Sequence, residues 1–247
     1  MMARPMFTFY GGKWRDAPNY PPPEHAIIVE PFAGAAGFSM RHHARRVVLV
    51  DADPVIAGTW RYLTSVSAGE ILGLPDIESG QTVDDLGVSQ EARWLIGWWL
   101  NKGTSRPRRS PSAWMRGGSR PMSFWGKAIR HRIARQLPLV SHWKIIEGSY
   151  ECAPDVAATW FIDPPYQGAG RHYVHGSSGI DYQRLGEWCR TRKGDVTVCE
   201  NVGATWLPFR PWRNVKASEA RHGGKVSREA IWSSHERAHS GRQEVLL

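Results

Sequence analysis

A short apolar run that leads into a glycine-rich turn constrains the fold of this chain most. Residues 26–29 are apolar throughout and are followed by Glu30-Pro31, and the turn Gly34-Ala35-Ala36-Gly37 comes soon after. Such a run suits a strand buried on both faces of a parallel sheet. Residues 38–46 can continue from the turn as a helix. Strand, glycine turn and helix in this order predict the first unit of an α/β fold.

A second unit of the same kind follows at once. Residues 47–50 form another buried apolar run, which ends at Asp51-Ala52-Asp53-Pro54 and precedes a helical pattern over residues 55–66. Two such units predict a doubly wound, Rossmann-like sheet, whose ligand lies at the carboxyl ends of the strands.

The rest of the chain adds further strands to this start. We expect strands at residues 143–146, 159–162 and 196–199, a helix at 181–190, and a closing antiparallel pair at 212–217 and 229–233. Residues 7–14 read as a short extended piece that breaks at Gly11-Gly12. Residues 69–90 show weak periodicity and receive no assignment.

Length and composition set the class of protein. The 247 residues, 41% of them hydrophobic, suffice for one sizeable α/β domain with an insertion or for two small domains. The sequence has no apolar run of the roughly 18 residues that a membrane span needs, and residues 1–10 lack the layout of a secretion signal. We therefore expect a cytoplasmic protein with no membrane partner.

Cysteine and histidine spacing gives no sign of a metal or a disulfide. Cys152, Cys189 and Cys199 form no paired spacing, and the ten histidines form no ligand pattern. We expect the three cysteines to be buried and inert, and we predict no metal site.

Positive charge is concentrated in one segment. The chain carries a net charge of +9, and residues 92–146 contain no Asp or Glu. Twelve of the 32 Lys and Arg residues lie in this segment, which leaves 20 basic against 23 acidic residues elsewhere. A basic surplus of this kind indicates an anionic partner, although a solvated surface is the ordinary alternative.

The basic segment interrupts the regular strand pattern. We expect a catalytic domain at residues 1–68 and 144–247 and an inserted region at 69–143. Arginines alternate there with Trp94, Trp98, Trp99, Trp114, Trp125 and Trp143, a mixture that can neutralise phosphates and contact bases. The i, i+4 spacing of Trp94 and Trp98 predicts that this pair is buried. The candidate DNA-binding residues are Lys102, Arg106, Arg108, Arg109, Arg116 and Arg120.

The tetrapeptide Asp163-Pro164-Pro165-Tyr166, at the end of a predicted strand, carries the strongest chemical signal. Two consecutive prolines fix the backbone and remove two N–H donors, so the chain presents carbonyl oxygens and a carboxylate. Such a shelf accepts hydrogen bonds from an amino group, and the tyrosine can stack on a planar base. An ordinary strand-ending turn with a surface tyrosine is the alternative.

Five pieces of this sequence occur in the order typical of one known family. They are Phe9-Tyr10-Gly11-Gly12-Lys13, Glu30-Pro31-Phe32-Ala33-Gly34-Ala35-Ala36-Gly37, Asp51-Ala52-Asp53, Glu147-Gly148-Ser149-Tyr150 and Asp163-Pro164-Pro165-Tyr166. In these pieces the chain resembles the Dam-type, alpha-class N6-adenine DNA methyltransferases, and the basic insert lies where that family keeps its target-recognition region. The family usually has a second glycine where this chain has Ala36, which suggests a slightly tighter turn.

The resemblance implies a function and a set of site residues. It implies transfer of a methyl group from S-adenosylmethionine, with S-adenosylhomocysteine as product, to the N6 amine of an adenine flipped out of double-stranded DNA. It also implies a bacterial or phage origin, as in restriction-modification systems. The catalytic residues would be Asp163, Pro164, Pro165 and Tyr166. The cofactor-binding residues would be Phe9, Tyr10, Lys13, Pro31, Phe32, Gly34, Gly37, Asp51, Ala52, Ser149, Tyr150 and Asp163.

Several of these residues have a physical role without the resemblance. Gly34 and Gly37 permit close backbone approach to a ligand, although glycine in such turns often serves packing. Asp51 lies 17 residues after Gly34, near the distance at which an acid accepts from ribose hydroxyls. Asp53 is the reserve candidate, and a helix N-cap is the alternative for both acids. Lys13 can reach a carboxylate, unless it is a surface lysine.

Other functions remain open from the sequence. The same shelf can methylate the N4 amine of cytosine, and only the resemblance favours adenine. Methylation of RNA or of a protein amide is a second alternative, although methyltransferases for protein glutamine carry Asn where this chain has Asp163. A DNA-binding relative that has lost catalysis is the alternative outside enzymes.

Overall fold

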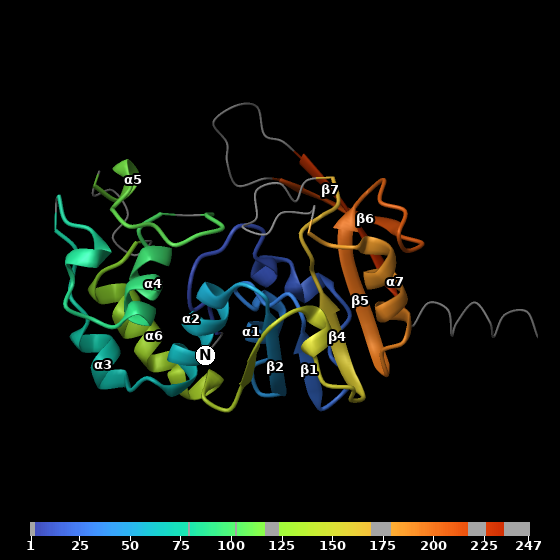
Figure 1. Cartoon of the computed structure of the whole chain (residues 1–247), viewed down its shortest axis with the longest axis horizontal. Coiled ribbons are helices and arrows are strands. Elements are labelled where there is room, and N and C mark those ends of the chain that lie inside the picture. The colour runs from blue at the N-terminus through green and yellow to red at the C-terminus, as the bar shows by residue number, and fades with distance from the viewer. Residues whose placement is uncertain are drawn as a thin grey trace, which may run out of the picture.

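One seven-stranded sheet forms the frame of the protein (Figure 1). The computed structural model describes residues 3–78, 80–101, 103–116, 124–168, 179–216 and 226–234. The strands are β1 (Ile27–Glu30), β2 (Arg46–Asp51), β3 (Lys144–Glu147), β4 (Ala158–Ile162), β5 (Gly194–Asn201), β6 (Arg210–Lys216) and β7 (Val226–Ser233). Their order across the sheet is β3-β2-β1-β4-β5-β7-β6. The fold is therefore mixed α/β and compatible with a Rossmann-like arrangement.

The strand order places a switch point between β1 and β4. From β1 the chain adds β2 and β3 on one side, and β4 and β5 extend the sheet on the other, with all five strands parallel. Ligands of open α/β sheets bind outside the carboxyl ends of the strands at such a point. β7 runs antiparallel to both β5 and β6, which confirms the predicted closing pair.

Seven α-helices connect or flank these strands among the described residues. They are α1 (Gly37–Arg41), α2 (Pro54–Ser65), α3 (Ala68–Gly73), α4 (Gln90–Trp98), α5 (Ala113–Arg116), α6 (Lys127–Val140) and α7 (Tyr182–Arg190). Short 3₁₀ segments occur at η1 (Lys13–Arg15), η2 (Ala17–Asn19), η3 (Val83–Asp85) and η5 (Tyr150–Cys152).

Several expectations about local structure need correction. The helix after the glycine turn was expected to extend to residue 46, but α1 ends at Arg41 because the turn at residues 42–45 must lead into β2. Residues 7–14 do not form a strand: the backbone turns at Tyr10-Gly11 and continues as η1. The unassigned residues 69–90 contain most of α3, all of η3 and the first residue of α4.

The helices between β2 and β3 share one hydrophobic core with the sheet. α3 packs on α6, and α2 packs on both α4 and α6 (Figure 1). Leu95, Trp98 and Ile133 of these helices belong to the same buried cluster as Trp60 and Phe38. The inserted region is thus packed directly on the α2 side of the sheet, with no separate core of its own among the described residues.

Two predictions of burial were wrong in part. Trp98 is fully buried, as expected, but Trp94 is only half-buried and packs its ring against Gly58 of α2. Cys189 and Cys199 are buried, whereas Cys152 is exposed because it lies on η5 at the surface. Within the described ranges, no helix is long and apolar enough to cross a membrane.

Candidate functional site

A cavity of roughly 500 Å³ lies at the carboxyl ends of β1, β2 and β4. Its walls come from the N-terminal segment, the glycine turn, the ends of these strands, η5 and the start of α7. All twelve residues predicted to bind a cofactor line it: Phe9, Tyr10, Lys13, Pro31, Phe32, Gly34, Gly37, Asp51, Ala52, Ser149, Tyr150 and Asp163. The fold therefore brings together residues of five sequence pieces, from Phe9 to Asp163.

The two glycines of the turn make room for the protein's own N-terminal segment. Gly34 has a φ of +46°, and a Cβ added there would lie 3.1 Å from the Phe9 ring. A Cβ on Gly37 would overlap the backbone of Lys13 and Trp14. Both glycines line the cavity, but the N-terminal segment packs so closely on them that there is little room for a side chain at either position.

Ala36 adopts a backbone conformation that normally belongs to glycine. Its φ is 47° and its ψ is 48°, and no other non-glycine residue with positive φ occurs in the described part of the chain. This left-handed region costs an L-residue roughly 1–2 kcal/mol. Ala36, where the family that the sequence resembles usually has glycine, therefore lies at a strained position.

Asp51 holds the glycine turn in place. Its Oδ2 accepts a hydrogen bond from the Gly34 N–H at 3.0 Å, and its Oδ1 accepts one from the Asp53 N–H at 2.9 Å. A carboxylate has about four acceptor positions, so this role is compatible with contacts to ribose hydroxyls. Asp53 is the N-cap of α2: its side chain accepts from the Val55 N–H, and Pro54 follows as the first helical residue. The capping alternative therefore holds for Asp53.

Aromatic rings line one end of the cavity. The Phe32 and Tyr150 rings stack with their centroids 5.7 Å apart, and Trp188 of α7 meets Tyr150 edge-on. Ser149 accepts from the Glu151 N–H and so begins η5, which carries Tyr150. These contacts create a flat apolar wall of the cavity.

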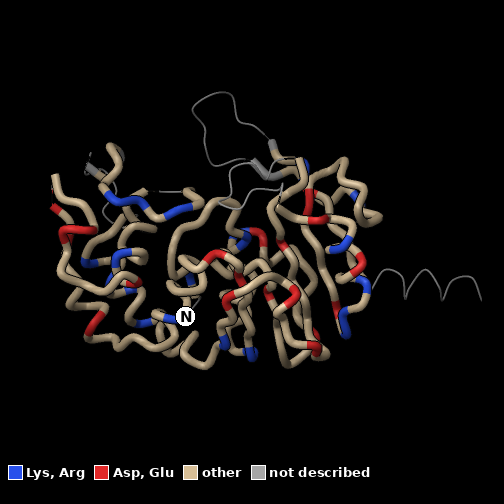
Figure 2. Tube along the Cα trace, in the orientation of Figure 1, with Lys and Arg blue, Asp and Glu red and all other residues tan. Residues whose placement is uncertain are grey.

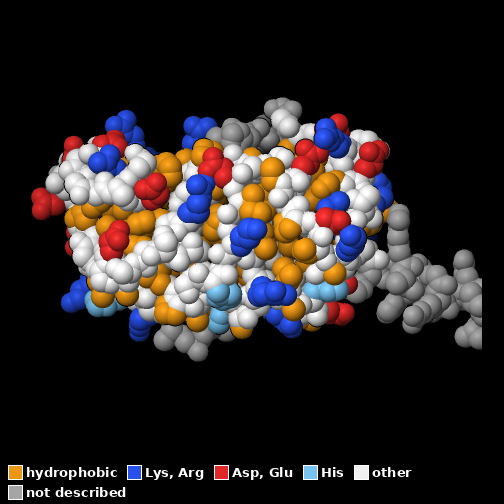
Figure 3. All heavy atoms as spheres, turned by 60° about the horizontal axis from the view of Figure 1, so that its bottom comes forward, with side chains coloured by type: hydrophobic (Ala, Val, Ile, Leu, Met, Phe, Trp, Pro, Cys, Tyr) orange, Lys and Arg blue, Asp and Glu red, His pale blue; other side chains and the backbone are white. Residues whose placement is uncertain are grey.

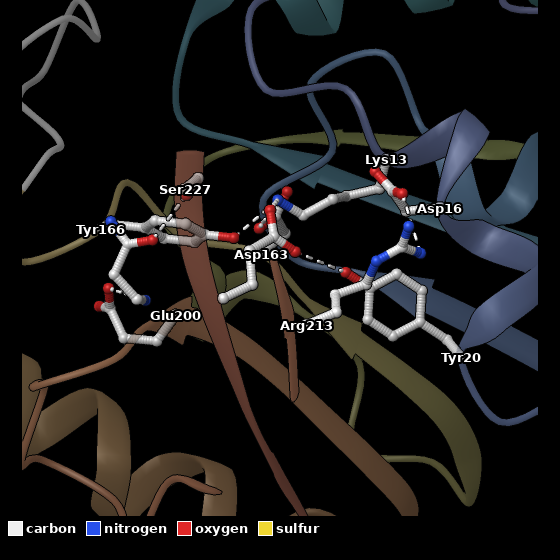
Figure 4. Close-up of polar contacts among 10 residues, drawn as sticks. Lys13, Asp16, Tyr20, Asp163, Tyr166, Glu200, Arg213 and Ser227 are labelled. Carbon is white, nitrogen blue, oxygen red and sulfur yellow. Dashed lines mark hydrogen bonds and ion pairs between the residues drawn. The ribbon is translucent and has the colours of Figure 1, made fainter. Parts of the chain in front are cut away.

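Neighbouring elements fix the segment Asp163-Pro164-Pro165-Tyr166 after β4. The Tyr182 hydroxyl, from α7, donates a hydrogen bond to the Pro165 carbonyl. The Glu200 carboxylate, at the end of β5, accepts from the Gln167 N–H at 3.0 Å (Figure 4). Asp163 and Pro165 line the cavity, and Pro164 is buried. The predicted rigid shelf is thus held from two sides.

Lys13 reaches this shelf from the N-terminal segment. Its Nζ donates to the Tyr166 hydroxyl at 2.6 Å and lies 3.3 Å from Asp163 Oδ1 and 3.4 Å from Glu229 Oε1. Figure 4 shows Lys13, Asp163 and Tyr166 with their polar ends toward one another. Burial lowers the pKa of Lys13, but the nearby Asp163 and Glu229 carboxylates raise it well above its usual value. Lys13 is 6% exposed, so the surface-lysine alternative is wrong.

Tyr166 is half-buried and does not line the cavity. Its hydroxyl contacts Lys13, whose Nζ also lies 4.9 Å from the centroid of the tyrosine ring. Stacking of a base on this ring therefore stays a prediction.

Two carboxyl groups in the cavity have raised pKa values. Burial raises the pKa of Asp163 to about 6, with Lys13 opposing and Glu229 adding to the shift. Burial also raises the pKa of Glu30 to about 8, although its carboxyl accepts from the Ser39 N–H at 2.7 Å. At neutral pH Asp163 is therefore mostly ionised and can accept hydrogen bonds from an amine, whereas Glu30 is mostly protonated.

The sequence did not reveal several residues of the site. Glu30 belongs to one of the five sequence pieces that carry the resemblance, but its neighbours in the sequence do not indicate that its carboxyl is buried. Glu229 lies in the predicted closing pair, where alternation gives no sign of a contact with residue 13. Arg184 and Glu151 form an ion pair of 2.6 Å at the cavity wall, and Ser105 joins the wall from the inserted region.

The loop after α4 carries the described candidates for DNA binding. Arg106, Arg108 and Arg109 are exposed there, and Figure 2 shows basic residues along this loop. Ser105 of the same loop lines the cavity, and the Thr104 carbonyl accepts from the Tyr10 N–H at 3.1 Å. The loop therefore connects an exposed basic surface to the cavity wall. Of the other candidates, the Arg116 side chain, Lys102 and Arg120 lie outside the described parts.

Part of the basic surplus serves the protein's own structure. Arg109 pairs with Asp84, and Arg130 pairs with Asp76. The Arg132 guanidinium lies 4.7 Å from the ring centroid of Trp99. The acid-free segment at residues 92–146 is thus partly neutralised by acids of residues 69–90. On the face shown in Figure 3, basic side chains are dispersed among apolar ones and do not form a single patch.

The described residues contain no group of three or more His, Cys, Asp or Glu that could hold a metal ion. No protein-family model matches the sequence. No curated protein matches it either.

Proposed function

We propose that this protein is an S-adenosylmethionine-dependent DNA methyltransferase that acts on the N6 amine of adenine. One observation carries the proposal: the twelve residues that the resemblance assigns to the cofactor line a single cavity, and Asp163 stands at its wall. The cavity also lies at the switch point of the sheet, where α/β folds bind their ligands.

The cavity fits a nucleoside cofactor. Its volume of roughly 500 Å³ is within the usual range for small-molecule sites, and it combines an aromatic wall with a few polar groups. Asp51 would accept from the ribose hydroxyls, Phe32 and Tyr150 would border the adenine ring, and Phe9 would lie near the sulfonium. When bound, S-adenosylmethionine supplies an already activated methyl group, so no covalent enzyme intermediate is required.

The shelf would position the amine of the flipped base. The Asp163 carboxylate and the Pro164 carbonyl would accept its two hydrogens and so direct the nitrogen lone pair into the cavity. The Tyr182 hydroxyl already donates to the Pro165 carbonyl and holds the shelf, and the resemblance assigns the amine to the Pro164 carbonyl. Asp163 would receive the proton late in the reaction, which its raised pKa favours.

DNA would approach along the loop after α4. Its exposed arginines can neutralise phosphates, and Ser105 places the same loop at the cavity wall. An adenine extruded from a duplex held there has a short path to the shelf.

Product analysis tests this function. Purified protein is incubated with methyl-labelled S-adenosylmethionine and DNA of mixed sequence, the DNA is digested to nucleosides, and the labelled product is identified. We expect N6-methyladenine, with no label when Asp163→Asn replaces the wild type. Label in N4-methylcytosine would overturn the choice of base, and a parallel RNA reaction tests that substrate class. Binding of DNA with no label in any product would favour the non-catalytic relative.

A further inference from the structure

The buried cluster at the shelf contains one cation and two carboxylates. Lys13 Nζ lies at nearly equal distances from Asp163 Oδ1 and Glu229 Oε1, 3.3 and 3.4 Å. The side chains of Lys13 and Glu229 are each 7% exposed, and that of Asp163 is 18% exposed. A single ammonium therefore has two candidate counter-ions in a place with little water to screen them.

Glu229 is held toward Lys13 by its own surroundings. It belongs to β7, pairs with Asn201 of β5 and with Arg213 of β6, and is buried. Its Oε2 accepts a hydrogen bond from the Tyr20 hydroxyl at 3.4 Å, which leaves Oε1 facing Lys13. Since Tyr20 also stacks on Trp212 of β6, the hairpin of β6 and β7 fixes both the Glu229 carboxylate and the Tyr20 hydroxyl that donates to it.

Asp163 is the carboxylate with unused hydrogen-bonding capacity. Its Oδ1 is buried and accepts no hydrogen bond of good geometry from a described residue, although Lys13 Nζ lies within ion-pair distance and both Lys13 and the Tyr166 hydroxyl act on the carboxyl group as donors that lower its pKa. A buried acceptor without a well-aligned donor destabilises the protein in the absence of ligand. Such an acceptor suits a site where the ligand brings the donor.

We propose that Glu229 is a positioning residue that neutralises Lys13 and thereby keeps the Asp163 carboxylate available for the amine of the substrate. The inference rests on the proposed function, because the amine is that of the flipped base. Without Glu229, the Lys13 ammonium would have Asp163 as its remaining counter-ion within 3.5 Å among the described residues. The incoming amine would then compete with a buried ion pair.

The groups that face Asp163 come from every side of the cluster. They are Lys13 on η1, Tyr20 just after η2, Glu30 on β1, Tyr166 on the shelf, Cys199 on β5 and Glu229 on β7. Glu229 raises the pKa of Asp163 by repulsion and Lys13 lowers it. Removing the charge of Glu229 should therefore lower the pKa of Asp163 from its value of about 6.

The test compares Glu229→Gln with a matched control in the full chain. Asp16→Asn weakens the 3.1 Å ion pair between Asp16 and Arg213, which joins the same N-terminal segment to the same hairpin (Figure 4). The substitution keeps the hydrogen bond from the Asp16 N–H to the Lys13 carbonyl and removes no partner of the Lys13 ammonium. The Asp163 carboxyl carbon is titrated by NMR in ¹³C-aspartate-labelled protein and assigned by its loss in Asp163→Asn. We expect its midpoint to move down by about one pH unit in Glu229→Gln and to stay unchanged in Asp16→Asn.

Activity gives a second readout. In Glu229→Gln, kcat/KM for DNA should fall by about tenfold, and the acidic limb of its pH profile should move down with the Asp163 midpoint. Glu229→Asp, which withdraws the carboxylate by one methylene group, should give smaller changes in the same direction and covers the case in which Glu229→Gln does not fold.

Two results would overturn the inference. One is an Asp163 midpoint that is the same in wild type, Glu229→Asp and any folded Glu229→Gln protein. The other is an equal change in Asp16→Asn, which would mean that the hairpin acts only as a support. If the wild type transfers no methyl group, the proposed function fails, whereas the NMR titration still shows whether Glu229 controls the charge of Asp163.

Discussion

The charges of the cluster around Lys13 are buried, whereas the charges of the loop after α4 are exposed to solvent. Lys13 has 7% of its side chain exposed and lies within 3.5 Å of two carboxylates, whereas Arg109 has 78% of its side chain exposed. Buried charges determine one another's protonation because little solvent separates them. Exposed charges act together through a field that salt screens. The buried cluster should therefore respond mainly to pH, and the exposed loop mainly to ionic strength.

The largest expected effect comes from removing the Asp163 carboxylate, to which the proposed function assigns the amine. Asp163→Ala should lower methyl transfer by on the order of 10³-fold or more, because the amine loses its acceptor and the proton its destination. The free energy of unfolding should change little, since Lys13 retains Glu229 as a counter-ion. Turnover and urea unfolding measure the two quantities. Turnover close to that of the wild type would refute the shelf mechanism, and the buried cluster would then not be the reaction site.

The exposed arginines should dominate the salt dependence of DNA binding. Replacing Arg106, Arg108 and Arg109 by Ala should weaken binding at low salt by about 10²-fold and reduce the slope of log K against log salt by about 2. The pair with Asp84 makes Arg109 the smallest contributor.

Fluorescence anisotropy at several salt concentrations measures this slope. Lys193→Ala is the control, because Lys193 is an exposed lysine paired with Asp155 at the opposite end of the strands. An unchanged slope in the triple variant would mean that DNA runs elsewhere.

Glu30 provides a second test of buried charge, because burial raises its pKa to about 8. The folded state then binds a proton that the unfolded state releases near pH 4.5, so this stabilising contribution is present at low pH and is lost as pH rises toward 8. The wild type should lose roughly 2 kcal/mol of unfolding free energy from pH 6 to 8 relative to Glu30→Gln. Urea unfolding at both pH values gives the difference, and parallel behaviour of the two proteins would contradict the raised pKa.

The smallest effect concerns the backbone of the buried site. Ala36→Gly should change the free energy of unfolding by less than about 1 kcal/mol, because relief of the left-handed strain offsets the lost methyl group and the greater freedom of the unfolded chain. Thermal unfolding measures this, with Ala57→Gly in the interior of α2 as the control that should cost more. A clear loss in Ala36→Gly would mean that the methyl group has a packing role beyond the turn.

Local patterns predicted the sheet well and residues 69–90 of the insert poorly. The strand that begins at residue 27, its glycine turn and the segment at Asp163 were all recognisable, since buried strands and proline-backed ends are properties of short sequence stretches. The structure of residues 69–90 was not recognisable, because α3 and η3 are too short to show a hydrophobic period. Cys152 and Trp94 show a similar limit, as burial depends on which element happens to cover a side chain.

The sequence by itself determined the order of strands and turns along the chain. It also determined which residues meet at the carboxyl ends of β1, β2 and β4, because parallel strands present these ends at one edge of the sheet. Only the tertiary structure decided the charges of the site. Lys13 and Glu229 lie 216 residues apart and meet because β7 inserts between β5 and β6. Burial then raises the pKa values of Asp163 and Glu30, a property of the surrounding protein that no short stretch of sequence contains.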